Sequence, residues 1–331
     1  MPLQSMGIVG AGAWGTALAI TGRRAGRDVI LWANEAETIA EINDSHRNAL
    51  YLPGVPLDPA IEATARFNEV ANCDMLLMVT PAQHLRAIAG ELAPYVRPGQ
   101  PLVICAKGIE QGTGKLMSQI AAEVLPEAEV AVLSGPSFAA DIARGLPAAV
   151  TLATSEQALG SALSHAISHA PFRCYWSDDV VGAEIGGAVK NVFAIAAGIV
   201  AGKELGASAH AALVTRGFAE MARFGMSLGA RLETLIGLSG LGDLLLTCGS
   251  SQSRNMSLGI ALAQGRAFDE VMNERLTVTE GVHTAGAVVE MAAARGIDMP
   301  IAKAVHQVIS GQATVDAAIG ALLSRPLRAE A

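Results

Sequence analysis

A glycine-rich turn near the amino terminus constrains the fold of this chain more than any other stretch. The apolar run Met6 to Val9 ends in Gly10-Ala11-Gly12-Ala13-Trp14-Gly15, which has the spacing G-x-G-x-x-G. In a strand–turn–helix unit of this kind, the first glycine allows a tight turn, the second lets the backbone approach a pyrophosphate, and the third lets the helix pack on the sheet. The helix N-terminus that follows favours phosphate groups. We therefore expect Gly10, Gly12 and Gly15 to bind a dinucleotide.

A carboxylate follows the next apolar run at the position that reads the ribose in such units. The run Asp28–Trp32 predicts the second strand, and Glu35 lies 20 residues beyond Gly15. An acid at this distance usually binds a ribose hydroxyl, whereas a 2′-phosphate needs a cation. Residues 32–35 contain no cation. The predicted cofactor is therefore NAD or NADP, with NADH used at least as well as NADPH.

The remaining hydrophobic pattern divides the chain into two parts. Short apolar runs alternate with helical patterns up to about residue 177, as in a doubly wound parallel sheet, and the further strands are expected at 74–79, 102–106, 130–133, 148–153 and 172–176. Alanine-rich stretches with a helical period then take over, at 181–201, 207–224, 232–236, 254–264, 281–295, 301–310 and 314–324. We predict an α/β chain with a Rossmann-type domain at 1–177 and an all-α domain at 178–331.

Composition narrows the functional class. The net charge of −8 argues against a general nucleic-acid binder, which needs clustered lysine and arginine. The four cysteines are far apart and form no C-x-x-C motif, so we expect neither disulfides nor zinc, and a reducing compartment fits. His165 and His169 are four residues apart but have no third ligand at a useful spacing. No metal site is predicted.

Two apolar stretches could be taken for membrane segments. Residues 1–22 hold five glycines, and their arginines follow the apolar part, which is the wrong order for a signal peptide. The stretch 185–202 contains Lys190 and Asn191 at its centre. We interpret both stretches as core elements of a cytoplasmic protein that does not span a membrane.

Lys190 and Asp243 are the first candidates for catalysis. Lys190 lies among Val189, Val192 and Phe193, where a charge is costly without a partner or a wet cleft. It is either a proton donor with a shifted pKa or a lysine that extends to solvent from a core helix. Asp243 follows a loop with three glycines, and it either pairs with a cation such as Lys190 or forms a turn or helix cap.

Three polar loops are candidates for binding a phosphate. The run 250–255 opens a helix with hydroxyls, Arg254 and Asn255, although Ser253 could be an ordinary helix N-cap. The loop 134–139 is a tight turn after a strand, and Lys107, also past a strand, could polarise a carbonyl or hold a phosphate. Cys248 has no neighbouring histidine and is interpreted as a buried structural residue.

Taken in order, these stretches resemble the bacterial NAD(P)-dependent glycerol-3-phosphate dehydrogenases. The shared motifs cover both predicted domains and are GAGAWGTALA, TPAQ (80–83), AKGIE (106–110), SGPSFA (134–139), GGAVKNVFAIAAG (186–198), TRGFAEM (215–221), GLSGLGDLLLTC (237–248), SQSRN (251–255) and TEGVHT (279–284). The resemblance implies hydride transfer between NAD(P)H and dihydroxyacetone phosphate, which gives sn-glycerol 3-phosphate for phospholipid synthesis. It also implies a homodimer.

The resemblance also assigns roles to individual residues. It implies that Lys190 is the general acid and base, with Lys107 and Asp243 beside it. The implied substrate contacts are Lys107, Gly135, Ser137, Lys190, Asp243, Ser253, Arg254 and Asn255. The implied cofactor contacts, beyond the three glycines and Glu35, are Ala13, Trp14, Asn34, Lys107, Ala139, Arg254, Val278 and Glu280.

Two alternatives stay open at this point. Another two-domain dehydrogenase, of the 6-phosphogluconate or 3-hydroxyisobutyrate type, would share the fold. A non-catalytic nucleotide sensor would keep the glycine-rich turn but would not need Lys190 and Asp243.

Overall fold

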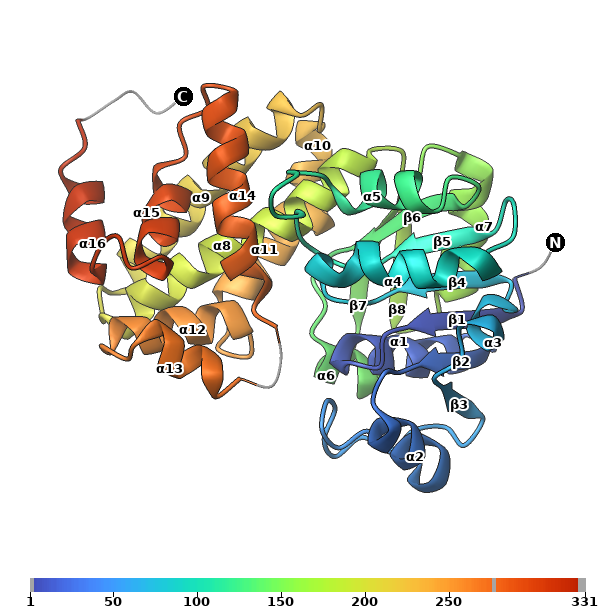
Figure 1. The fold of residues 1–331 in the computed structure, drawn as a ribbon. Coiled ribbons are helices and arrows are strands. Elements are labelled where there is room, and N and C mark those ends of the chain that lie inside the picture. Colours follow the sequence, from blue (N-terminus) through green and yellow to red (C-terminus); the bar gives the residue numbers. More distant parts are fainter. Residues whose placement is uncertain (1–2, 276–277, 327–331) are drawn as a thin grey trace.

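The computed structural model describes residues 3–275 and 278–326, so the outer ends of the two predicted domains lie outside the described residues. A sheet with helices on both faces lies beside a purely helical region, and α8 (Val180–Gly202) starts against the sheet and runs into the middle of the helical region (Figure 1). The predicted class, a Rossmann-type sheet followed by helices, is confirmed.

Eight strands form one sheet in the order β3-β2-β1-β4-β5-β6-β7-β8. Their bounds are β1 (Ser5–Val9), β2 (Asp28–Trp32), β3 (Ile61–Thr64), β4 (Met75–Met78), β5 (Pro101–Ile104), β6 (Glu129–Ser134), β7 (Ala148–Ala153) and β8 (Phe172–Ser177). The order reverses between β1 and β4, and ligands of doubly wound sheets bind at the carboxyl ends of the strands at such a point. The G-x-G-x-x-G turn follows β1 directly.

One strand direction differs from the expected parallel sheet. β7 is antiparallel to β6, whereas the other neighbouring strands are parallel. The connection between β6 and β7 holds only the five-residue α6 (Ala139–Ala143) in place of a full crossover helix, and the chain returns beside β6 in the opposite direction.

The edge strand β3 was not expected from the sequence. It is only four residues long and alternates apolar with polar side chains, so it forms no apolar run. Its outer edge is covered by Asn43 of α2 (Ala36–Ser45). The Asn43 amide donates to Ala63 O at 3.0 Å and accepts from Ala63 N–H at 2.8 Å.

Helices cover both faces of the sheet. Those that share an apolar core with one face are α1 (Ala13–Arg24), α2, α6 and α7 (Gln157–Ile167). Those on the other face are α3 (Phe67–Ala71), α4 (Leu85–Leu92), α5 (Met117–Val124) and the first turn of α8. Two short 3₁₀ helices, η1 (Ala82–His84) and η2 (Ala93–Tyr95), flank α4.

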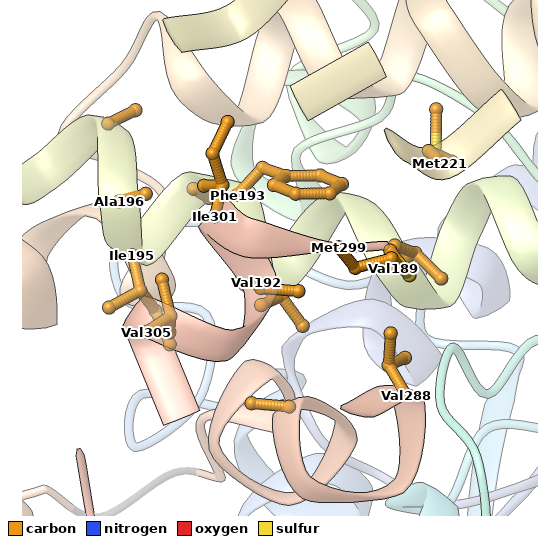
Figure 2. Close-up of a cluster of buried hydrophobic side chains, with 14 of the residues drawn as sticks. Val189, Val192, Phe193, Ile195, Ala196, Met221, Val288, Met299, Ile301 and Val305 are labelled. Atoms are coloured by element: carbon orange, nitrogen blue, oxygen red, sulfur yellow. The ribbon is translucent and has the colours of Figure 1, made fainter. Parts of the chain in front are cut away.

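α8 is the central element of the helical region. Around it lie α9 (Ala207–Ser227), α10 (Leu232–Leu235), the π-helical turn η3 (Leu238–Gly242), α11 (Asp243–Cys248), α12 (Arg254–Ala263), α13 (Phe268–Asn273), α14 (Glu280–Ala294), α15 (Pro300–Ile309) and α16 (Val315–Leu323). Val189, Val192 and Phe193 of α8 pack with side chains of α9, α14 and α15 (Figure 2). Within the described part of the chain, α8 alone is long and apolar enough to cross a membrane, and it is buried in this core.

α8 and α12 cross with their backbones in contact. A Cβ atom on Gly198 would lie 2.0 Å from Met256 O, and one on Gly259 would lie 2.0 Å from Ile195 O. Glycine at these two positions therefore allows α12, which begins with Ser253 and Arg254, to lie directly against the helix that carries Lys190.

Candidate active site

The turn after β1 has the geometry of a pyrophosphate site. Gly10 has φ +121°, which a glycine adopts readily, and a Cβ on Gly15 would lie 1.8 Å from Gly10 O. A Cβ on Gly12, by contrast, would meet no atom within 4 Å. The space above Gly12 is therefore open, and the free N–H groups of α1 begin at Ala13. The backbone at the three glycines is compatible with a bound dinucleotide, and their role as cofactor contacts stays a prediction.

Trp14 follows Ala13 in the first turn of α1. Its side chain is half-buried, and its Nε1–H is shielded from solvent without a hydrogen-bond partner among the described residues.

Asn34 and Glu35 follow β2 and are both exposed. Glu35 lies at the N-terminus of α2, and the Tyr51 hydroxyl donates to its Oε1 at 3.4 Å. The two arginines that end α1 lie at the other end of β2 and are engaged there. Arg23 binds Asp28 and Asp58, and Arg24 donates to Ile142 O and Ala143 O. Neither arginine is therefore free to meet a 2′-phosphate in this arrangement.

One carboxylate binds two lysines from different parts of the chain. Lys190 Nζ of α8 lies 2.6 Å from Asp243 Oδ1, and Lys107 Nζ, which follows β5, lies 2.7 Å from Asp243 Oδ2. Asp243 is 1% exposed and Lys190 is 7% exposed. The interpretation of Lys190 as a side chain that extends to solvent is therefore wrong, and so is that of Asp243 as a turn or cap residue. One cation was expected beside Asp243, and the structure places two there, Lys107 and Lys190.

This arrangement fixes the charge states of the group. Burial lowers the pKa of Lys190 to about 8, although Asp243 opposes the change. Burial would raise the pKa of Asp243, but the ammonium groups of Lys107 and Lys190 outweigh burial and hold that pKa below its usual value. Near neutral pH the cluster therefore carries two positive charges and one negative charge.

Thr247 belongs to the cluster but was missed in the sequence. Lys190 Nζ donates to Thr247 Oγ1 at 2.8 Å, and Thr247 is 3% exposed. A threonine in the apolar run Leu244 to Cys248 resembles any core threonine. Thr247 could have been identified from its spacing of four residues from Asp243, because that spacing puts both side chains on one face of α11.

The loop after β6 lies against Lys107. Lys107 Nζ donates to Gly135 O at 2.9 Å, and the Ser137 hydroxyl donates to the same oxygen at 3.0 Å. Gly135 has φ +152°, and a Cβ there would lie 2.8 Å from Val150 Cα, so the turn requires glycine. Ala139 begins α6 just after this loop.

The start of α12 presents the second candidate phosphate site. Ser253 is the N-cap, and its Oγ accepts from Met256 N–H at 3.3 Å. The interpretation of Ser253 as an ordinary cap is thus confirmed, and the hydroxyl proton stays available to a ligand. Arg254 is exposed, and among the described residues its guanidinium has no hydrogen-bond partner.

Asn255 connects α12 to α8 and α14. Its Nδ2 donates to Asn191 Oδ1 at 2.9 Å, and its Oδ1 accepts from Gly281 N–H at 3.0 Å. Asn191 directly follows Lys190 in α8. The start of α12 is thereby fixed beside the lysine cluster, although no hydrogen bond among the described residues joins Ser253 or Arg254 to either lysine.

Glu280, the first residue of α14, contacts the turn that follows β4. Its Oε1 accepts from Ala82 N–H at 3.0 Å, in the turn after β4, and its Oε2 is buried without a partner among the described residues. Val278, two residues earlier, is half-buried. Because β4 is the neighbour of β1 at the point where the strand order reverses, Glu280 and Val278 lie near the same crevice as the glycine-rich turn.

Two family models match the chain. The model described as the NAD-dependent glycerol-3-phosphate dehydrogenase N-terminus covers residues 5–160, and the model described as the C-terminus covers residues 179–320.

Curated relatives and a solved structure agree with these models. The chain is 57% identical to a glycerol-3-phosphate dehydrogenase (NAD(P)+) of Parvibaculum lavamentivorans, over 99% of this chain and 98% of that protein. It is 55% identical to one of Caulobacter vibrioides, over the full length of both. The crystal structure of a Coxiella burnetii glycerol-3-phosphate dehydrogenase superposes with a TM-score of 0.93 at 35% identity and covers 98% of this chain and 100% of that one. The chain therefore belongs to the NAD-dependent glycerol-3-phosphate dehydrogenase family and is an oxidoreductase that uses NAD or NADP.

Proposed function

We propose that the chain reversibly reduces dihydroxyacetone phosphate to sn-glycerol 3-phosphate and so supplies phospholipid synthesis. The observation that carries this proposal is the carboxylate of Asp243 shared by Lys190 and Lys107, because a buried cluster with net positive charge suits the reduction of an anionic ketone. The relatives and the family models that match the chain are named for glycerol 3-phosphate, one member of this substrate pair, which supports the proposal.

Lys190 is the proposed general acid and base. When bound, NAD(P)H supplies the hydride that converts the ketone carbon into the carbinol carbon. Negative charge then develops on the ketone oxygen, where an ammonium group stabilises it and donates a proton. Two hydrogen bonds of Lys190 are taken up by Asp243 and Thr247, which leaves its third N–H for that oxygen.

Lys107 and Asp243 maintain the charge state of Lys190. When Lys190 gives up its proton, the ion pair between Lys107 and Asp243 remains and is neutral overall. Asp243 therefore does not lose its last cationic partner during the reaction, and the neutral amine of Lys190 stays buried without an unbalanced carboxylate beside it.

The start of α12 is the proposed phosphate site. Three groups there favour a dianion, namely the hydroxyl proton of Ser253, the N-terminus of a ten-residue helix, and the guanidinium of Arg254, which makes no hydrogen bond among the described residues. The proposed substrate contacts are Lys107, Gly135, Ser137, Lys190, Asp243, Ser253, Arg254 and Asn255.

The cofactor is proposed to lie along the carboxyl edge of β1 and β4. Two observations support this placement of the cofactor. The space at Gly12 is open, and Oε2 of Glu280 has no partner among the described residues. The proposed contacts are Gly10, Gly12, Ala13, Trp14, Gly15, Asn34, Glu35, Lys107, Ala139, Arg254, Val278 and Glu280.

The division into a cofactor domain at 1–177 and a catalytic domain at 178–331 is also part of the proposal. β8 ends at Ser177 and α8 begins at Val180, which supports it. We further propose a homodimer in the cytoplasm, where the four free cysteines suit a reducing environment.

The deciding experiment is oxidation of NADH and of NADPH by the purified protein with dihydroxyacetone phosphate. We expect oxidation with this substrate and much less with unphosphorylated dihydroxyacetone. Stronger activity in the reverse direction with 6-phosphogluconate or 3-hydroxyisobutyrate than with glycerol 3-phosphate would contradict the proposal.

A further inference from the structure

A buried carboxylate on α8 contacts the sheet region, away from the lysine cluster. Glu184 lies six residues before Lys190 and is 5% exposed. Its Oε1 accepts from Ser118 N–H at 2.8 Å, and its Oε2 accepts from the Ser118 hydroxyl at 2.5 Å. Ser118 is the second residue of α5, which packs on the sheet.

Glu184 acts as a helix cap supplied by another part of the chain. The residue at the N-cap position of α5 is Leu116, whose side chain has no oxygen to accept from the first N–H groups of the helix. The groups that act on the Glu184 carboxyl all belong to α5, namely the Ser118 hydroxyl and the N–H groups of Ser118 and Met117. Burial without a cation raises the pKa of Glu184 to about 7, so the contact is made at a cost in desolvation.

The same contact joins the two segments that carry the lysines. Lys107 follows β5, and the loop that begins with it ends where α5 begins at Met117. Lys107 therefore holds one end of this loop through Asp243, and Glu184 holds the other end through Ser118. Both holding groups belong to the helical region, and Glu184 shares α8 with Lys190.

We propose that Glu184 is a positioning residue, which through Ser118 fixes the Lys107 loop relative to α8 and so sets the separation of the two lysines. This inference rests on the proposed catalytic role of Lys190 and Lys107. Displacement of a reacting group by ~1 Å can reduce turnover ~100-fold, so loss of the contact has a measurable effect.

Glu220 provides a matched control. It lies on α9, is 2% exposed, and accepts from Ile301 N–H at 2.9 Å and Ala302 N–H at 3.2 Å at the start of α15. Burial raises its pKa to about 7, as for Glu184. Glu220 therefore caps a helix in the same way, but both partners lie within the helical region.

The test compares Glu184→Gln with Glu220→Gln, and Ser118→Ala with Ser118→Thr. We expect Glu184→Gln and Ser118→Ala to lower kcat by about tenfold or more with little change in the Kd for NADH, whereas Glu220→Gln and Ser118→Thr stay within about twofold of the wild type. The Tm of the two glutamine variants should change by similar amounts. Equal kcat values in Glu184→Gln and Glu220→Gln would overturn the inference.

A second readout does not depend on the substrate. Amide hydrogen exchange in residues 107–118 should accelerate in Glu184→Gln and stay at the wild-type rate in Glu220→Gln. Unchanged exchange in both variants would overturn the positioning role. Failure of the wild type to oxidise NADH or NADPH with dihydroxyacetone phosphate would instead overturn the proposed function, and the exchange experiment would still decide the role of Glu184.

Discussion

Lys190 of α8 lies 2.6 Å from Asp243 of α11, and the exposed fractions of the two side chains are only 9% and 1%. Removal of one partner from a buried ion pair usually destabilises a protein strongly, because the other charge stays buried without compensation. Here Asp243 has a second ammonium partner in Lys107, so the carboxylate stays paired if Lys190 is lost. The cluster can therefore be tested by substitution without leaving an isolated buried charge.

Replacing Lys190 by methionine should abolish most of the turnover. The Lys190→Met side chain keeps the length and apolar packing but has no proton to donate, and a general acid typically contributes ~10²–10⁴-fold. We expect kcat to fall by at least about a hundredfold, while NADH binding measured by fluorescence titration and the free energy of unfolding change little. A folded variant that keeps more than about a tenth of the wild-type kcat would exclude Lys190 as the acid.

The pH dependence of the reaction should report the pKa of Lys190. Reduction needs the protonated amine, and burial lowers that pKa to about 8, so kcat/KM for reduction should fall as the pH rises above about 8. Oxidation needs the neutral amine and should increase over the same range. The measurement is a pair of pH–rate profiles, one for each direction of the reaction. The rate of reduction should fall and the rate of oxidation should rise over the same pH range. Profiles with the same direction near pH 8 would show that another group controls proton transfer.

Arg254→Gln should weaken the use of a phosphorylated substrate. A charge-assisted hydrogen bond contributes about 1.5–3 kcal/mol, which corresponds to about a ten- to 150-fold loss of kcat/KM with dihydroxyacetone phosphate. Unphosphorylated dihydroxyacetone should lose much less. Because Arg254 is also a proposed cofactor contact, the Kd for NADH is measured in parallel. Equal losses on both substrates would show that Arg254 does not bind the phosphate.

Glu35 should favour NADH over NADPH. The carboxylate follows β2, and Arg23 and Arg24 are held by other groups, so a 2′-phosphate would meet a negative charge there. We expect kcat/KM for NADH to equal or exceed that for NADPH. Glu35→Gln should raise the relative affinity for NADPH in a fluorescence titration. A kcat/KM for NADPH at least about ten times that for NADH would contradict this assignment.

Glu220 should make the protein less stable as the pH rises. Burial raises its pKa from 4.5 to about 7, so its contribution to stability is fully present below pH 4.5 and is lost as the pH rises through 7. The loss corresponds to about 3 kcal/mol, at about 1.4 kcal/mol for each unit of pKa. Urea unfolding of the wild type and of Glu220→Gln between pH 5 and pH 8 should show a smaller decline in the variant. Parallel curves would contradict the expectation.

The parts of the site that sequence could predict are those where a residue conflicts with its surroundings or where spacing alone is specific. Gly10, Gly12 and Gly15 follow a strand and open a helix, and this spacing in this context is typical of a dinucleotide-binding turn. Lys190 and Asp243 are charges in apolar stretches, and each therefore implied a partner. The α/β class followed in the same way from the change of hydrophobic period near residue 177.

The parts that sequence could not predict depend on contacts between distant segments. Lys107 and Asp243 are separated by 136 residues, and no local pattern brings them together. Thr247 and Glu184 are ordinary members of helical patterns until their partners are known. β7 returns antiparallel to β6 after a short connection, and β3 is a four-residue edge strand whose outer groups at Ala63 pair with the Asn43 amide. Neither feature leaves an apolar pattern in the sequence.

The pairing of Asn43 with Ala63 also limits how this protein can associate. An exposed edge strand can accept a strand from a second molecule and so start sheet-to-sheet aggregation. At β3 both outward groups of Ala63 are already bound by the Asn43 amide, and an incoming strand would have to break these two hydrogen bonds. A dimer that continues the sheet through β3 is therefore disfavoured, and Asn43→Ala should expose this edge to self-association.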